Sequence, residues 1–167
     1  YGAHNGNSLL EVYLDTVAGV GKNVICVGMG NEGVSAAHKA LTLQEGEILE
    51  IEFSIGELES STNLQLWKAY ADEVKIFIEN PGGEVAGPLE EVPAVQRFRL
   101  SDTDFLVYYG MPTPYGVLQE IYIDFLPRNQ YLPSGIWKMR RCTLSACAQA
   151  VMWLPRHQNK ARLSPTA

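Results

Sequence analysis

From Gly46 onward, hydrophobic and polar residues alternate in short runs separated by turns. The first runs, Ile48–Ile55, Leu64–Tyr70 and Val74–Ile78, have a period of two, the pattern of strands with one buried face. Further short apolar runs follow at a spacing of roughly 8–12 residues or a little more: Val95–Leu100, Phe105–Tyr109, Val117–Leu126, Ile136–Arg141 and Ala148–Leu154. About eight strands at this spacing predict a mainly β fold, an eight-stranded jelly-roll-like β-sandwich.

The N-terminal part of the chain has a different pattern. After the capping residues Asn7-Ser8, apolar residues recur every three or four positions through Val17, which predicts an amphipathic helix that Gly19 ends. Val24–Val27 is a continuous apolar run, and such a run predicts a strand buried on both faces. We expect Val34–Leu43 to form a short helical turn or a loop.

These patterns predict three parts. Residues 1–45 form a helix, a strand and a glycine-rich loop; residues 46–155 form the sandwich; residues 156–167 form a polar return segment. The first residue is Tyr1 rather than an initiator Met, and from this we expect an excised piece or a processed product.

Composition narrows the classes of partner. The net charge of -6 and the scattered basic residues give no basic patch with interleaved aromatics, so we expect no nucleic acid partner. No apolar run is long enough to cross a membrane, so we expect no membrane partner. Of the three cysteines, Cys26 lies in the expected buried strand, whereas Cys142 and Cys147 could clip a turn but match no zinc motif. We expect no metal ion.

The glycine-rich loop after Val24–Val27 allows two interpretations. Written as Gly28-x-Gly30-x-x-Gly33 after a strand, it fits a dinucleotide-binding fingerprint, with Glu47, Glu50 or Glu52 near the spacing of the ribose-binding acid. However, Val34–Leu43 is short for a crossover helix, and the residues after Gly46 predict only strands. We therefore expect no nucleotide cofactor and keep dinucleotide binding as a minor alternative.

The second interpretation depends on a resemblance that covers nearly the whole chain. The stretch from Tyr1 through Val24-Ile25-Cys26-Val27-Gly28-Met29-Gly30-Asn31-Glu32-Gly33 resembles the segment that carries the oxyanion-hole asparagine in subtilisin-like serine proteases. Within that family it is most similar to the clostridial branch, which includes the spore-germination proteases. Later marks are also similar, namely Leu66-Trp67, the Pro81-Gly82 turn, Gly135-Ile136-Trp137-Lys138-Met139, Trp153-Leu154-Pro155 and Leu163-Ser164-Pro165-Thr166-Ala167.

The resemblance implies specific roles. Asn31 would donate a hydrogen bond to the oxyanion, residues 1–45 would be a fragment of the catalytic core, and residues 46–155 would be the jelly-roll domain that this branch inserts. The substrate would be a peptide or protein, and the partner would be the rest of the catalytic domain of a bacterial, spore-associated or secreted enzyme. The segment alone would be inactive, because Asp15, His4, His38 and His157 do not stand in triad motifs. An open strand edge also predicts that Val24–Val27 pairs with another copy, which would give homo-oligomers, or folds back on the sandwich.

A rival from another class is a free-standing sandwich that binds carbohydrate or protein on its aromatic faces. It is suggested by a set of tyrosines, Tyr108, Tyr109, Tyr115, Tyr122 and Tyr131. We expect Trp67, Trp137 and Trp153 to lie in the core or on a sheet face rather than to form a sugar platform. The acidic pairs Glu57/Glu59, Glu90/Glu91 and Asp102/Asp104 are expected to be solvated.

Overall fold

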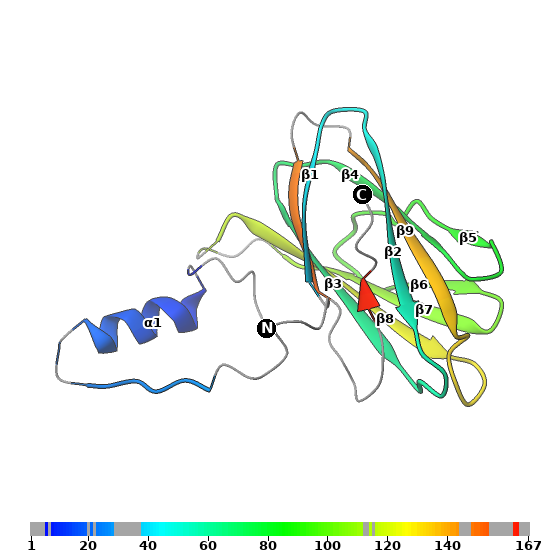
Figure 1. Ribbon diagram of the computed structural model, residues 1–167. Coiled ribbons are helices and arrows are strands. Elements are labelled where there is room, and N and C mark those ends of the chain that lie inside the picture. Colours follow the sequence, from blue (N-terminus) through cyan, green and yellow to red (C-terminus); the bar gives the residue numbers. More distant parts are fainter. Residues whose placement is uncertain are drawn as a thin grey trace.

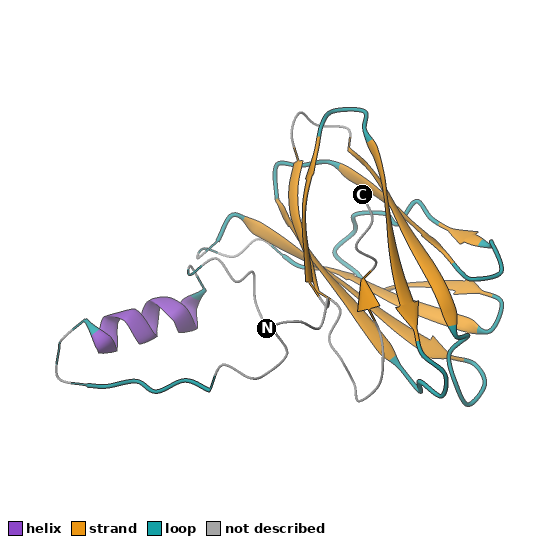
Figure 2. Ribbon diagram, viewed as in Figure 1, coloured by secondary structure: helices purple, strands orange, loops and turns teal. Residues whose placement is uncertain are grey.

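The computed structural model describes residues 6, 8–19, 21, 23–28, 38–111, 114, 116–143, 148–153 and 162–163, and it is mainly β (Figures 1 and 2). The elements in chain order are α1 (Leu9–Ala18), β1 (His38–Leu43), β2 (Ile48–Ile55), β3 (Thr62–Ala69), β4 (Val74–Glu79), β5 (Val85–Ala86), β6 (Gln96–Leu100), β7 (Thr103–Tyr109), β8 (Leu118–Pro127), β9 (Gly135–Thr143), β10 (Ala148–Trp153) and β11 (Arg162–Leu163). The predicted β-sandwich is confirmed.

Two antiparallel sheets form the sandwich. One sheet has six strands in the order β1-β10-β3-β8-β7-β6, and the other has five in the order β11-β2-β9-β4-β5. All eight predicted strands are present, as β2, β3, β4 and β6 to β10. The structure adds the edge strands β1, β5 and β11, of which the last two contain only two residues each.

The hydrophobic residues that alternate along the predicted strands form the core of the sandwich. Along β2, Ile51, Phe53 and Ile55 face inward, and Phe53 is paired in register with Trp137 on β9. Four aromatic rings meet between the sheets, with centroids 4.9 Å apart for Phe105–Phe125 and 5.5 Å apart for Phe125–Trp137. Trp137 is fully buried and its indole N–H donates to the carbonyl of Pro133, so a large ring is accommodated without an unpaired donor.

Strand β1 corrects the expectation for Val34–Leu43. Residues 38–43 form an edge strand that pairs with β10, and Leu43 is fully buried in the core. The alternation in this stretch is short and is preceded by small and polar residues, so the sequence pattern alone did not identify a strand. The sandwich therefore begins before residue 46, and β11 returns to it by pairing with β2 at Phe53 and Ser54.

The helix is confirmed where it was predicted, but the apolar run after it is not a strand. Ser8 caps α1 through a reciprocal pair, in which its Oγ accepts from the N–H of Glu11 and its own N–H donates to the Glu11 carboxylate. Residues 23–28 have no strand partner among the described residues, and all of them are exposed. The prediction of a buried strand at Val24–Val27 is wrong for this chain, because no described element covers either face of it.

Figure 1 shows α1 and residues 23–28 to one side of the sandwich. No residue of α1 is buried, and Leu9, Leu10 and Tyr13 are each more than half exposed. Val24 is 91% exposed and Val27 is 68% exposed. This N-terminal part therefore contributes nothing to the sandwich core.

Candidate functional site

The glycine-rich loop is the predicted catalytic site, and most of it lies outside the described residues. Asn31, Gly30 and Gly33 fall there, whereas Gly28 is described and exposed. The oxyanion role of Asn31 therefore stays a prediction. For the dinucleotide alternative, the fold gives no support, since such folds need parallel strands joined by helices and the strands from residue 38 onward pair antiparallel.

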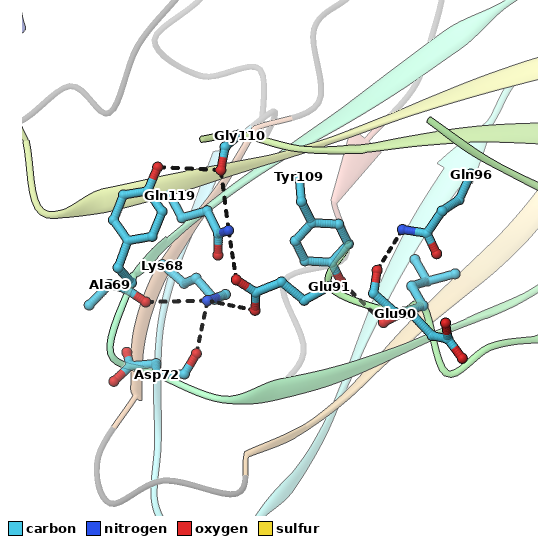
Figure 3. Close-up of polar contacts among 11 residues, drawn as sticks. Lys68, Ala69, Asp72, Glu90, Glu91, Gln96, Tyr109, Gly110 and Gln119 are labelled. Atoms are coloured by element: carbon cyan, nitrogen blue, oxygen red, sulfur yellow. Dashed lines mark hydrogen bonds and ion pairs between the residues drawn. The ribbon is translucent and has the colours of Figure 1, made fainter. Parts of the chain in front are cut away.

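A buried polar cluster lies at one end of the sandwich, and the sequence analysis did not identify it (Figure 3). Lys68 on β3 is fully buried, and its Nζ donates to the carbonyls of Asp72 at 2.8 Å and Ala69 at 3.4 Å. The same Nζ lies 3.5 Å from the carboxylate of Glu91. Gln119 on β8 donates to the other Glu91 oxygen at 2.8 Å. A buried ammonium with this many acceptors is well compensated.

The cluster holds the connection between β5 and β6 against the sheets. The hydroxyl of Tyr109 donates to the carbonyl of Leu89 at 3.2 Å, and the N–H of Leu89 donates to the carbonyl of Ile76. Burial raises the pKa of Tyr109, so its hydroxyl stays a donor at neutral pH. At Gly87, where φ is +129°, an added Cβ would lie 2.7 Å from the Ile76 carbonyl. The connection therefore needs glycine at this point.

Arg141 on β9 lies in the interior as well. Its side chain is fully buried, and none of Nε, Nη1 and Nη2 has a hydrogen-bond partner within the described part of the chain. Leaving a buried donor unpaired costs about 1–3 kcal/mol, and more when the group is charged. Burial lowers the pKa of Arg141 to about 10, which still leaves the guanidinium charged at neutral pH.

Lys68 and Arg141 could have been found from the sequence. In Leu64-x-Leu66-x-Lys68 and Trp137-x-Met139-x-Arg141, the period-two pattern places both cations on the inward side, directly after core residues. The pattern by itself does not predict that these two cations are buried, because charged residues are almost never fully buried.

The outer face of the five-stranded sheet has a network of ion pairs. Arg140 contacts Glu50 at 2.8 Å and also pairs with Glu79, while Lys138 lies 3.0 Å from Glu50. Hydrogen bonds from Arg140 and Lys138 lower the pKa of Glu50. These charged groups lie on adjacent strands, are partly exposed, and have opposite charges that balance. We therefore interpret them as a solvated face of the sheet.

Two of the acidic residues expected to be solvated, Asp104 and Glu59, are buried instead. Asp104 is buried beneath Arg97 and Arg99, at 2.6 Å and 2.9 Å, and hydrogen bonds from these two residues lower its pKa. Glu59 is also buried. Asp104 and Glu59 lie in a turn or at the end of a strand. Neighbouring segments of the chain cover them there, and the local sequence does not show which segments these are. Asp102, Glu57 and Glu90 are exposed as expected.

The aromatic residues are divided between the core and the outer face of the six-stranded sheet. Tyr109 faces inward and is buried, whereas the rings of Tyr108 and Tyr122 pair edge to face at 6.1 Å on half-buried positions of the opposite side. Trp137 lies in the core, as expected, and Trp67 is half-buried. Binding of carbohydrate or protein on such a face stays a prediction.

Other candidates give no assembled site in the described part of the chain. His38 lies exposed on β1, whereas His4, His157 and Cys147 are outside the described residues. Cys26 is a free, exposed cysteine rather than a buried core residue, because the strand expected around it is not formed. No group of three or more potential metal ligands is found among the described residues. Their single helix is too short to span a bilayer.

Comparison with solved structures gives a strong match to a protease. The structure of the Clostridium perfringens CspB protease superposes with a TM-score of 0.87 and 28% sequence identity, over 99% of this chain and 35% of that one. The propeptide form of Bacillus licheniformis lipase BlEst2 superposes with a TM-score of 0.43 and 10% identity, over 89% of this chain and 27% of the lipase. No family model and no curated protein matches the sequence. The chain thus spans about a third of the length of the protease it resembles.

Proposed function

We propose that this chain is an internal segment of a subtilisin-like serine endopeptidase of the clostridial type. The observation that carries the proposal is the match to the CspB protease, which extends over 99% of this chain at 28% identity. A match over this share of the chain extends beyond the sandwich into the N-terminal part. The described strands correspond to a jelly-roll domain that follows the oxyanion loop and braces the catalytic body.

The exposed apolar residues of the N-terminal part support the same proposal. Leu9, Leu10, Tyr13, Val24 and Val27 are all more than half exposed. Their spacing on α1 is that of a helix with a buried face, and the run at 24–27 is that of a central strand. Burying one such side chain contributes about 1.5–3 kcal/mol. In the complete enzyme, neighbouring strands and helices of the catalytic body would cover them.

Asn31 would supply one donor to the active site. It follows the run 24–27 within a few residues, where a side-chain amide could extend from a strand end toward the oxyanion of the tetrahedral intermediate. The nearby glycines would keep that position clear of Cβ atoms. The nucleophile, the base and the group that orients the base would come from other parts of the enzyme. The segment alone would then not hydrolyse peptides.

The experiment is a substitution in the longer protein that contains this chain. Asn31→Ala should lower kcat for a peptide substrate by about 10²–10³ with little change in KM, since the donor acts on the transition state. The control is Asn129→Ala, an exposed amide in a sandwich loop, which should leave kcat unchanged. Equal kcat values for Asn31→Ala and the unmodified enzyme, with both proteins folded, would contradict the role of Asn31.

A further inference from the structure

The surroundings of Arg141 support an inference that does not depend on the protease proposal. Its guanidinium is fully buried, and its three nitrogens lack hydrogen-bond partners among the described residues. Tyr109 is an electrostatic neighbour, but its hydroxyl donates to Leu89. Asp72 is the other neighbour, and no hydrogen bond joins its half-buried side chain to Arg141 within the described chain.

The two carboxylates that act on the buried cations of this region, Glu91 and Asp72, are themselves partly exposed. Lys68 and Arg141 are both fully buried cations. The carboxylate of Glu91 lies 3.5 Å from Lys68 and accepts from the Gln119 amide at 2.8 Å, and the Glu91 side chain is 47% exposed. Figure 3 shows Glu91 between these two groups, with Lys68 also directed at the carbonyls of Ala69 and Asp72. Within the described part of the chain, Arg141 is a desolvated positive charge with no hydrogen-bonded counter-ion.

We propose that Arg141 binds a small monovalent anion, such as chloride, inside this end of the sandwich. A guanidinium has donors only, and a monovalent anion satisfies both its hydrogen bonds and its charge, whereas a water molecule satisfies only the former. Asp72 and Tyr109, which act electrostatically on Arg141, would lie near the anion. The anion would fasten β9 to the cluster that holds the β5–β6 connection.

Bromide is the probe, because it replaces chloride and scatters anomalously. In crystals of the 167-residue chain soaked in sodium bromide, we expect an anomalous peak at hydrogen-bond distance from the guanidinium of Arg141. In solution, the unfolding midpoint should rise by roughly 3–6 °C for each tenfold increase in bromide above its dissociation constant, at ionic strength held constant with gluconate.

Two variants separate this site from general salt effects. Arg141→Met keeps an unbranched side chain of similar length, and replacing a buried charge by an apolar group is often neutral or stabilising, so it should fold and lose the bromide dependence. Arg140→Met is the matched control, since Arg140 is the next residue on β9 but faces outward to Glu50 and Glu79. It should keep the bromide dependence of the unmodified chain.

Three results would overturn the proposal. They are a water molecule without anomalous signal at Arg141, a direct Arg141–Asp72 ion pair in the crystal, or an equal rise of the midpoint in Arg141→Met and the unmodified chain. The bromide peak is measured on the unmodified protein, so the test does not depend on the folding of any variant.

Discussion

At the scale of single residues, burial separates charges that look alike in the sequence. Asp102 and Asp104 flank the same turn, yet only Asp104 is buried and bound by two arginines. Lys138 and Arg140 face solvent, whereas Arg141, the next residue on β9, lies in the interior. The chemistry of each group therefore follows from the face of the strand on which it lies.

The ion pairs of Asp104 predict a pH dependence of stability. Its pKa is lowered from the ordinary 3.8 by Arg97 and Arg99, so the folded state binds fewer protons there than the unfolded state does. This contribution is present above about pH 4 and is lost as the pH falls through the lowered pKa of the folded state. Asp104→Asn should therefore destabilise the chain more at pH 7 than at pH 2.5, as measured by urea unfolding.

Asp102→Asn is the control for this experiment, because it removes an exposed carboxylate from the same turn. Its effect should be within about 0.5 kcal/mol at both pH values. If Asp104→Asn gave the same loss of stability at pH 2.5 as at pH 7, the ion pairs would not account for the pKa shift.

At the scale of elements, strand β1 decides where the sandwich begins. It pairs with β10 along its whole length and places Leu43 among the fully buried residues. Leu43→Ala should lower the free energy of unfolding by about 2–5 kcal/mol, as expected for a leucine truncated in a packed core. Thr42→Ala, an exposed change on the same strand, should alter it by no more than about 0.5 kcal/mol.

Urea unfolding of the two variants gives the comparison directly. Similar stabilities for Leu43→Ala and Thr42→Ala would mean that β1 is not part of the folded sandwich, and that the domain begins near residue 46 as the sequence pattern alone suggested.

The strands that could be predicted are those whose alternation extends over five or more residues. Residues such as Phe53, Leu66 and Ile123 identify an inward face without any knowledge of their partners. Strands β5 and β11 have only two residues each, so they contain no period to detect. The run at Val24–Val27 shows a different limit of the sequence pattern. An apolar run indicates that a segment can be buried, but it does not indicate what covers the segment.

Only part of the candidate site could be predicted from the sequence. The role of Asn31 came from a resemblance of order and motif, and the described residues do not include it. The cluster around Lys68 joins side chains from β3, β7 and β8 with the connection between β5 and β6. Such a group of contacts depends on how the strands are ordered in the two sheets, and local pattern does not contain that order.

At the scale of the whole molecule, the sandwich has a hydrophobic core, while the described residues before β1 have none. Trp137, Phe53 and the other core residues lie between the two sheets, whereas no residue of α1 or of 23–28 is buried. The CspB match covers both parts, although this chain amounts to 35% of that structure. These facts support the proposal that a folded inserted domain is attached to part of a catalytic body.

Hydrogen exchange at the backbone amides of Val24–Val27 tests this account most directly. The 167-residue chain and the longer protein that contains it are compared by peptide-resolved mass spectrometry, with the β2 amides as an internal reference that should be protected in both. We predict that the four amides exchange freely in the chain and about 10³-fold or more slowly in the longer protein, where they would join a sheet. Equally fast exchange in both proteins would contradict the claim that this segment is a strand of a larger catalytic body.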